Sequence, residues 1–275
     1  KSGVRTRQLP GVSPLVFSRF LLEKTAFLSL SDMGKALPSY EEIPIACRMD
    51  EAVQSEYKRI ENALVRVLRS DRRAAQKILS VYLNLLTAYP DQPYDQKPIL
   101  YPDSDVPIVE PENIGDADTL GEKELRTLEI VKAAIQNGER ALIYTSWVRT
   151  DSQQKLKKLL ADEGYRTEIL TDKIKTTDRE DWVQKKLAAG MQVLIVNPSL
   201  VETGLDLNAF TTLVFYSMGY KLFTLRQASR RSWRINQKAP SVKVYMLYYE
   251  DTMQQKCLKL MASKLAVAGL IEGNF

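Results

Sequence analysis

The second half of the chain alternates short apolar runs with amphipathic segments, and this alternation limits its fold more than any other feature. A helical pattern over 120–136 precedes the apolar run Ala141–Tyr144, and comparable runs follow at 166–170, 192–196, 212–216 and 242–248. The capping box that begins a helix is matched by Thr150–Gln153, after the first of these runs, and by Thr177–Glu180, after the second. Strands that alternate with helices are typical of a parallel sheet, so we predict an α/β fold in which helices flank such a sheet.

The first half of the chain has a different pattern. Between Ala52 and Ala88 the apolar residues recur at helical spacing, which predicts two amphipathic helices that meet near Asp71. Residues 1 to about 50 mix apolar pieces with prolines, a pattern that favours short elements. Six prolines lie within 89–112, and because proline has no backbone N–H we predict a linker without a regular hydrogen-bond ladder. We therefore predict a mainly helical region with a Pro-rich linker at 1–115 and the α/β domain at 116–275.

The chain has 275 residues and no histidine, which excludes several classes of catalytic site. Without imidazole there is no Ser-His-Asp or Cys-His nucleophile pair and no HExxH zinc helix. Cys47 and Cys257 are far apart and neither belongs to a CxxC pair, so we predict no metal site and no disulfide. Unpaired cysteines suit a reducing compartment, and we expect an intracellular protein, in the cytoplasm rather than the nucleus.

Hydropathy and net charge say little about the binding partners of the chain. The least charged stretch, 187–201, contains Gly190 and Pro198 and is too short to cross a bilayer, so we expect no membrane partner. The formal net charge is 39 − 34 = +5. A charge of this size indicates an anionic partner only if the cations are concentrated in one place.

The densest cluster of such cations lies between Gln227 and Gln237. On a helix Gln227, Arg231 and Arg234 would lie at i, i+4 and i+7 and share one face. Guanidinium groups are planar forks that match phosphate oxygens, so this face is suited to bind an anion. A solvated basic helix surface is the alternative that these residues leave open.

This segment resembles the QxxxRxxRxGQ motif that ends the second RecA-like lobe of Swi/Snf-type ATPases, a branch of the superfamily 2 helicases and translocases. Gln227, Arg231, Arg234 and Gln237 match position by position, and Asn236 replaces the motif's glycine. The resemblance implies a RecA-like parallel sheet flanked by helices, with Gln227 at the ATP site. It also implies that Arg231 and Arg234 are catalytic residues that face the phosphates of ATP, and that Arg234 is the arginine finger.

Two segments before it resemble further parts of the same lobe. Arg140–Trp147 resembles the strand and turn that open the lobe, which implies nucleic-acid contacts from Ser146 and Trp147. A core position for Trp147 is an equally open alternative. Tyr165–Trp182 resembles the segment in which an arginine precedes a helix, which implies a nucleic-acid contact from Arg179. A solvated residue in the first turn of the helix is the alternative for Arg179.

Gln192–Asn208 resembles the motif that links the ATP and nucleic-acid sites of these enzymes. Gly204 matches the family pattern, whereas Asp206 stands where the family has a glycine. The resemblance implies ATP contacts from Gly204 and Asp206 and nucleic-acid contacts from Asn197 and Ser199. Ligands collect at the carboxyl ends of strands in α/β domains, which favours this interpretation of a segment that follows a buried strand.

As a whole, the resemblance implies the C-terminal fragment of a nucleic-acid-dependent ATPase, a helicase or DNA translocase, with 1–115 as the inter-lobe region. Its cofactors would be ATP and Mg²⁺, and its partners DNA, with RNA left open, and the first RecA-like lobe of the same polypeptide. The chain contains no GxxxxGK[ST] phosphate loop, so we expect the magnesium ligands in that lobe and no activity from the chain alone. The alternative is a non-enzymatic α/β module that binds nucleic acid or protein.

Overall fold

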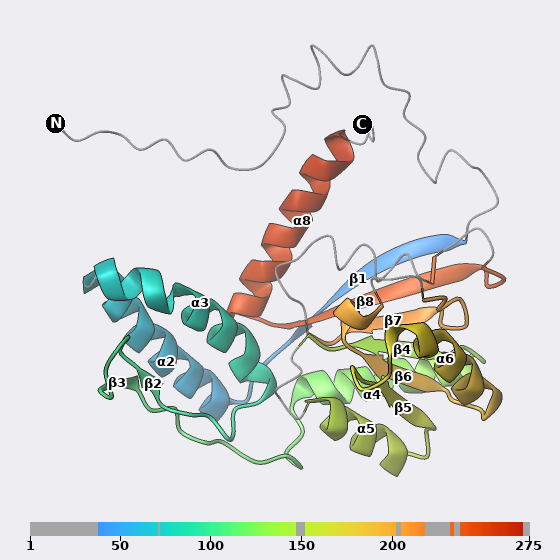
Figure 1. Cartoon of the computed structure of the whole chain (residues 1–275), viewed down its shortest axis with the longest axis horizontal. Helices are drawn as coiled ribbons and strands as arrows, with labels where there is room; N and C mark the ends of the chain where they lie inside the picture. The colour runs from blue at the N-terminus through green and yellow to red at the C-terminus, as the bar shows by residue number, and fades with distance from the viewer. Residues whose placement is uncertain are drawn as a thin grey trace.

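A parallel sheet forms the centre of the molecule, as predicted. The computed structural model describes residues 38–70, 72–146, 152–201, 205–217, 232–233 and 237–271. Within these residues the main sheet has six strands in the order β1-β8-β7-β4-β6-β5, and every neighbouring pair is parallel (Figure 1). The strands are β1 Ser39–Cys47, β4 Ala141–Tyr144, β5 Thr167–Leu170, β6 Val193–Val196, β7 Thr212–Phe215 and β8 Ser241–Tyr249. The five predicted runs are therefore confirmed as β4 to β8.

Strand β1 is the one member of this sheet that the sequence did not predict. It pairs with β8 along its whole length, from Ser39 beside Ser241 to Cys47 beside Tyr249. Its sequence includes adjacent glutamates and Pro44, which are poor strand formers, but Pro44 is tolerated because β1 lies at the edge of the sheet. Part of the region predicted to be mainly helical thus completes the sheet, and the division at 115 and 116 stays a prediction.

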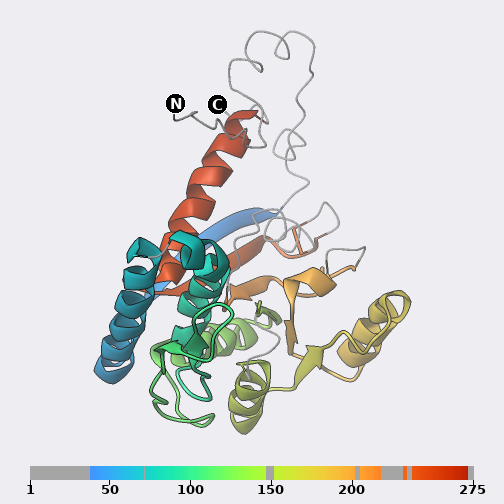
Figure 2. The same ribbon diagram turned by 60° about the vertical axis from the view of Figure 1, so that its left-hand side comes forward.

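Alternate side chains of the short central strands form two apolar cores, one on each face of the sheet. Ile143, Ile195 and Val214 point to the face that α4 (Glu122–Gln136) and α5 (Ser152–Asp162) cover. Tyr144, Val196 and Phe215 point to the other face, which α6 (Arg179–Ala188) covers through Val183. Figure 2 shows these helices around the sheet from a second direction. Helices on both faces bury these four-residue strands fully, which explains their continuous apolar sequences.

One predicted capping box is wrong. A 3-10 turn, η5 (Thr176–Asp178), precedes α6, and Thr177 Oγ1 donates to Asp178 Oδ1 at 2.7 Å instead of capping the helix. Glu180 accepts a hydrogen bond from the distant Asp206 N–H at 2.8 Å, so it does not complete a box. Of the other predicted box, Thr150 lies outside the described residues.

A second layer of helices lies beside the sheet. Helices α2 (Glu51–Ser70) and α3 (Arg72–Ala88) form a hairpin, which confirms the two helices predicted to meet near Asp71, although Asp71 itself is outside the described residues (Figure 1). The Pro-rich segment was predicted to lack a ladder, but it contains the short antiparallel pair of β2 (Ile99–Leu100) and β3 (Pro107–Val109). Helix α8 (Met253–Ile271) begins against this layer, where Met253 joins the apolar cluster of Tyr57, Ile60 and Leu86. Among the described helices none is long and apolar enough to span a bilayer.

Cys47 and Cys257 are both buried thiols. Burial raises the pKa of the Cys47 thiol to about 12. Because the thiolate is the reactive form, we expect neither thiol of the native chain to react with an aromatic disulfide reagent near neutral pH. Unfolding in guanidinium chloride should release two reactive thiols per chain, measured by absorbance. Reaction of one thiol in the native chain at the rate of an unfolded peptide would contradict the buried position of these residues.

Candidate functional site

Polar residues from three neighbouring central strands meet at the carboxyl edge of the sheet. Ser146 follows β4, Asn197 follows β6 and Ser217 follows β7. The Ser146 N–H donates to Ser217 Oγ at 2.6 Å, and Ser146 Oγ donates to the Ser217 carbonyl at 3.0 Å. Asn197 Nδ2 donates to the Ser146 carbonyl at 3.3 Å. The three strand ends are therefore held together by side chains, and we call these residues, with Ser199, the strand-end cluster.

Ser199 completes the cluster through a short turn after β6. Asn197 caps the 3-10 turn η6 (Pro198–Leu200), since its Oδ1 accepts hydrogen bonds from Ser199 N at 2.9 Å and Ser199 Oγ at 2.7 Å. The structure thus brings together Ser146, Asn197 and Ser199, three of the residues predicted to contact nucleic acid. Ser217 was not predicted from the sequence, although it stands two residues after β7, as Ser146 does after β4.

Arg179 has a clear structural role. Its guanidinium donates to the Ile174 carbonyl at 3.2 Å and to the Leu200 carbonyl at 2.9 Å, so it ties the loop before α6 to the end of η6. Because Leu200 is next to Ser199, Arg179 lies near the strand-end cluster. Two of its guanidinium donors are already bonded to backbone carbonyls. The predicted contact with nucleic acid stays a prediction.

Asp206, predicted to contact ATP, organises the segment that leads into β7. Its Oδ1 accepts from Asn208 N at 3.0 Å and its Oδ2 accepts from Asn208 Nδ2 at 3.3 Å. Its own N–H donates to Glu180 at the start of α6. The carboxylate therefore stabilises a local turn, and its role toward ATP stays a prediction.

In the segment that resembles the arginine motif, the structure describes residues 232, 233 and 237, on both sides of position 234. Ser232 is fully buried and its Oγ donates to the Leu207 carbonyl at 3.1 Å. Gln237 Nε2 donates to the carbonyls of Asn208 at 2.8 Å and Ser232 at 2.9 Å. The segment resembling the arginine motif is thus bonded directly to the segment resembling the link between the ATP and nucleic-acid sites. The remaining predicted site residues lie outside the described residues: Trp147, Gly204, Gln227, Arg231 and Arg234.

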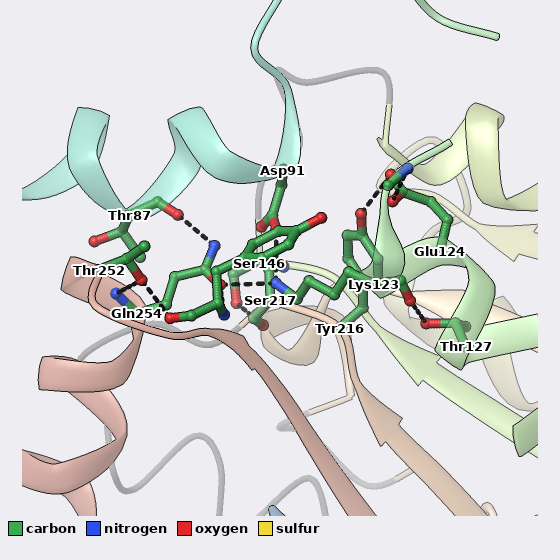
Figure 3. A network of polar contacts seen from close by, with 12 residues as sticks. Thr87, Asp91, Lys123, Glu124, Thr127, Ser146, Tyr216, Ser217, Thr252 and Gln254 are labelled. Carbon is green, nitrogen blue, oxygen red and sulfur yellow. Dashed lines mark hydrogen bonds and ion pairs between the residues drawn. The ribbon is translucent and has the colours of Figure 1, made fainter. Parts of the chain in front are cut away.

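A second polar group lies deep in the molecule and was not predicted. The Lys123 side chain, at the start of α4, is fully buried, and its Nζ lies 2.6 Å from Asp91 Oδ1 and 3.0 Å from Gln254 Oε1 (Figure 3). Gln254 Nε2 in turn donates to the Thr87 carbonyl of α3 at 2.8 Å. Burial raises the pKa of the Asp91 carboxyl, against the lowering effect of the Lys123 ammonium. These contacts join α3, α4, α8 and the 3-10 turn η4 (Tyr89–Asp91).

A second buried pair adjoins the first. Lys155 Nζ of α5 lies 2.9 Å from Glu124 Oε1, which also accepts a hydrogen bond from the Tyr216 hydroxyl at 2.9 Å. Burial, followed by the charge of Glu124, raises the pKa of the Tyr216 hydroxyl well above its usual value. Lys123 Nζ also lies 4.7 Å from the centre of the Tyr216 ring, so the two pairs share this aromatic side chain. We call the two pairs, with Gln254 and Tyr216, the buried charge network.

The sequence contained a signal for this network. Thr127, Val131 and Ala134 are buried on one face of α4, and Lys123 lies four residues before Thr127 on the same face. A lysine in line with a buried stripe has to find a buried acceptor, but its partner Asp91 comes from a segment 32 residues away in the chain. The described residues contain no group of three His, Cys, Asp or Glu side chains placed to hold a metal ion.

Comparison with known proteins identifies the domain that contains the arginine motif. Residues 123–236 match the family model of the helicase conserved C-terminal domain. No curated protein sequence matches the chain.

Solved structures share the fold. The crystal structure of the C-terminal part of the Fun30 ATPase domain superposes with a TM-score of 0.64 at 13% identity, over 86% of this chain and 96% of that one. The Sulfolobus solfataricus SWI2/SNF2 ATPase core in complex with dsDNA superposes with a TM-score of 0.61 at 19% identity, over 86% of this chain and 47% of that one. This chain therefore spans about half of that core. Residues 123–236 of this chain are thus similar to the helicase conserved C-terminal domain, and the fold is similar to that of the C-terminal part of the Fun30 ATPase domain and to part of the SWI2/SNF2 ATPase core.

Proposed function

We propose that this chain acts as the second lobe of a DNA-dependent ATPase, a helicase or translocase, in which Arg234 is the arginine finger and Arg231 binds the phosphates of ATP. The observation that carries this proposal is the direct bonding of Ser232 and Gln237 to the carbonyls of Leu207 and Asn208. It supports a single unit made from the two segments to which the resemblance assigns ATP contacts. A conformational change on one segment would then be transmitted to the other.

ATP hydrolysis in this proposal takes place between two lobes. The first RecA-like lobe of the same polypeptide would supply the phosphate loop and the carboxylates that hold Mg²⁺. The ion and the arginines of this chain would neutralise the charge that spreads over the γ-phosphate oxygens in the transition state. Gln227, Gly204 and Asp206 would line the nucleotide side of this lobe.

The strand-end cluster supports a nucleic-acid contact at the carboxyl edge of the sheet. The hydroxyls of Ser146 and Ser199 already donate within the cluster, so the donors that could turn to a ligand are the Ser217 hydroxyl, which accepts from Ser146 N, and the second amide N–H of Asn197. Such groups commonly donate to phosphate oxygens of nucleic-acid backbones. Contacts of this kind fix the position of a strand without reading its sequence. A solved relative is a SWI2/SNF2 core in complex with dsDNA, and we propose double-stranded DNA as the partner here as well.

The experiment compares this chain alone with a polypeptide that joins it to its first lobe. ATP turnover is measured without nucleic acid, with double-stranded DNA and with RNA of equal length. We expect no turnover from the chain alone, and turnover from the two-lobe protein that double-stranded DNA stimulates.

Three outcomes would contradict the proposal. Turnover by this chain alone at a helicase-like rate would show that no other lobe is needed. A two-lobe protein that binds DNA but never hydrolyses ATP would favour the non-enzymatic binding module, and stimulation by RNA alone would replace the proposed partner.

A further inference from the structure

Trp233, which directly precedes Arg234, is held by the first residues of the sheet's edge strand. Its indole Nε1 donates a hydrogen bond to the Pro38 carbonyl at 2.9 Å. Its ring lies 5.1 Å from the ring of Tyr40, measured between centroids, at an interplanar angle of 43°. Both rings pack against the apolar core that lies on the α6 face of the sheet. Residues 195 positions apart in the chain thus meet at this point.

The contacts of Trp233 complete a set of anchors on both sides of Arg234. Ser232 is bonded to the segment before β7, Trp233 to the residue before β1, and Gln237 to Asn208. Only residues 234–236 lie between the anchors at 233 and 237. The described residues on both sides of Arg234 are therefore held by contacts to distant segments, and Trp233 is covalently bonded to Arg234.

We propose that Trp233 is a positioning residue for Arg234, and that its hydrogen bond to Pro38 and its ring contact with Tyr40 tie the arginine finger to the start of β1. This inference rests on the proposed function of Arg234. Trp233 itself contacts neither ATP nor the reacting atoms. Its role is to hold the backbone at residue 233 at a set place relative to the sheet.

Pro38 and Tyr40, which contact Trp233, come from the first part of the chain. Pro38 and Tyr40 belong to the region 1–115 that we predict to lie between the two lobes, and they are the first described residues of the chain. Ser232 and Gln237, in contrast, are anchored to Leu207 and Asn208, which lie outside that region. Trp233 is therefore the described contact through which the inter-lobe region can alter the position of Arg234. Displacement of a catalytic group by about 1 Å can lower a rate by roughly a hundredfold.

The test uses the two-lobe protein and two substitutions at position 233. Trp233→Ala removes both contacts, and we expect kcat for DNA-stimulated ATP hydrolysis to fall by roughly a hundredfold, while KM for ATP changes by less than about threefold. Trp233→Phe keeps the ring contact with Tyr40 and loses only the N–H donor. We expect it to lower kcat by about tenfold, less than Trp233→Ala does, because one of the two contacts of Trp233 is kept.

Trp182 provides the matched control, because it packs against the same apolar core from α6 and not from the arginine motif. Trp182→Phe and Trp182→Ala should leave kcat within about twofold of the parent protein, even if they lower the melting temperature. An unchanged kcat in Trp233→Phe, or an equal loss of kcat in the Trp182 variants, would overturn the proposal. If Trp233→Ala does not fold, Trp233→Phe decides the matter.

A double-mutant cycle separates positioning from general packing. Tyr40→Leu removes the other ring of the contact, so its effect on kcat and that of Trp233→Phe should be non-additive. Additive effects would mean that the two rings act independently and would overturn the link to β1. Arg234→Ala is measured in the same assay. If it leaves turnover unchanged, the proposed function itself fails; if it abolishes turnover while Trp233→Phe does not reduce it, only the positioning role fails.

Discussion

Replacing Arg234 with alanine in the two-lobe protein is expected to lower kcat for DNA-stimulated ATP hydrolysis by roughly three to five orders of magnitude. The guanidinium would contact the γ-phosphate oxygens most strongly in the transition state, where their charge is most widely spread. An interaction made mainly in the transition state affects kcat more than nucleotide affinity. Nucleotide binding, measured by titration with a fluorescent ATP analogue, should therefore be largely retained.

Two variants sharpen the Arg234 experiment. Arg234→Lys keeps the charge but loses the planar fork, and we expect it to restore little of the lost rate. Arg126→Ala is the control, since Arg126 is a half-exposed arginine of α4 that pairs with Glu122 and Glu129 of its own helix. It should leave kcat unchanged. If Arg234→Ala has the same small effect as Arg126→Ala, Arg234 belongs to a solvated basic surface.

Replacing Lys123 with methionine is expected to lower the free energy of unfolding of this chain by about 3–5 kcal/mol. The side chains of Lys123 and Asp91 are fully buried, so the substitution leaves the Asp91 carboxylate buried without its cation. The loss is measured by urea unfolding at neutral pH, followed by circular dichroism. Lys77→Met is the control: Lys77 pairs with Asp103 at the surface, and the loss of such a pair changes stability by no more than about 1 kcal/mol.

The double variant Lys123→Met with Asp91→Leu tests the cause of this loss. It removes both charges, so it should recover most of the stability that the single variant loses. Acid should also reduce the deficit of the single variant. Burial raises the pKa of Asp91, and without Lys123 nothing nearby offsets that effect to the same degree. A group whose folded pKa is raised is tolerated when protonated, so the deficit is smallest at low pH and grows as the pH rises. A deficit that is equal at pH 5 and pH 8, or that persists in the double variant, would contradict this explanation.

The buried charge network also predicts how the parts of the molecule unfold. Asp91 and the Thr87 carbonyl belong to the helical layer, whereas Lys123, Glu124 and Lys155 belong to helices that cover the sheet. Separation of the two layers would expose these charges one by one without their partners. The two layers therefore unfold together in our view, which agrees with the β1 strand of the first region completing the sheet of the second.

Local features of the sequence were sufficient for the elements of the α/β lobe. Each central strand is a continuous apolar run because helices cover both faces of the sheet, and α2 and α3 carry one apolar face each. The predicted site residues Ser146, Asn197 and Ser199 came from the resemblance to the Swi/Snf-type motifs, and the structure brings them together because the parallel strands that they follow end at one edge. The start of α6 was misplaced because Thr177 and Glu180 have polar partners other than the helix backbone.

Contacts between distant segments could not be read from the sequence in the same way. The amino-acid sequence by itself determined that five apolar runs are strands, that the sheet is parallel, and that an arginine-rich segment precedes its last strand. Only the tertiary structure decided that the unpromising segment 39–47 is an edge strand, that Lys123 has its counter-charge in Asp91, and that Trp233 is tied to Pro38. The physical reason is that periodicity reports which side of an element is buried, whereas a strand partner, a counter-ion or a hydrogen-bond acceptor depends on which distant residue the folded chain places beside it.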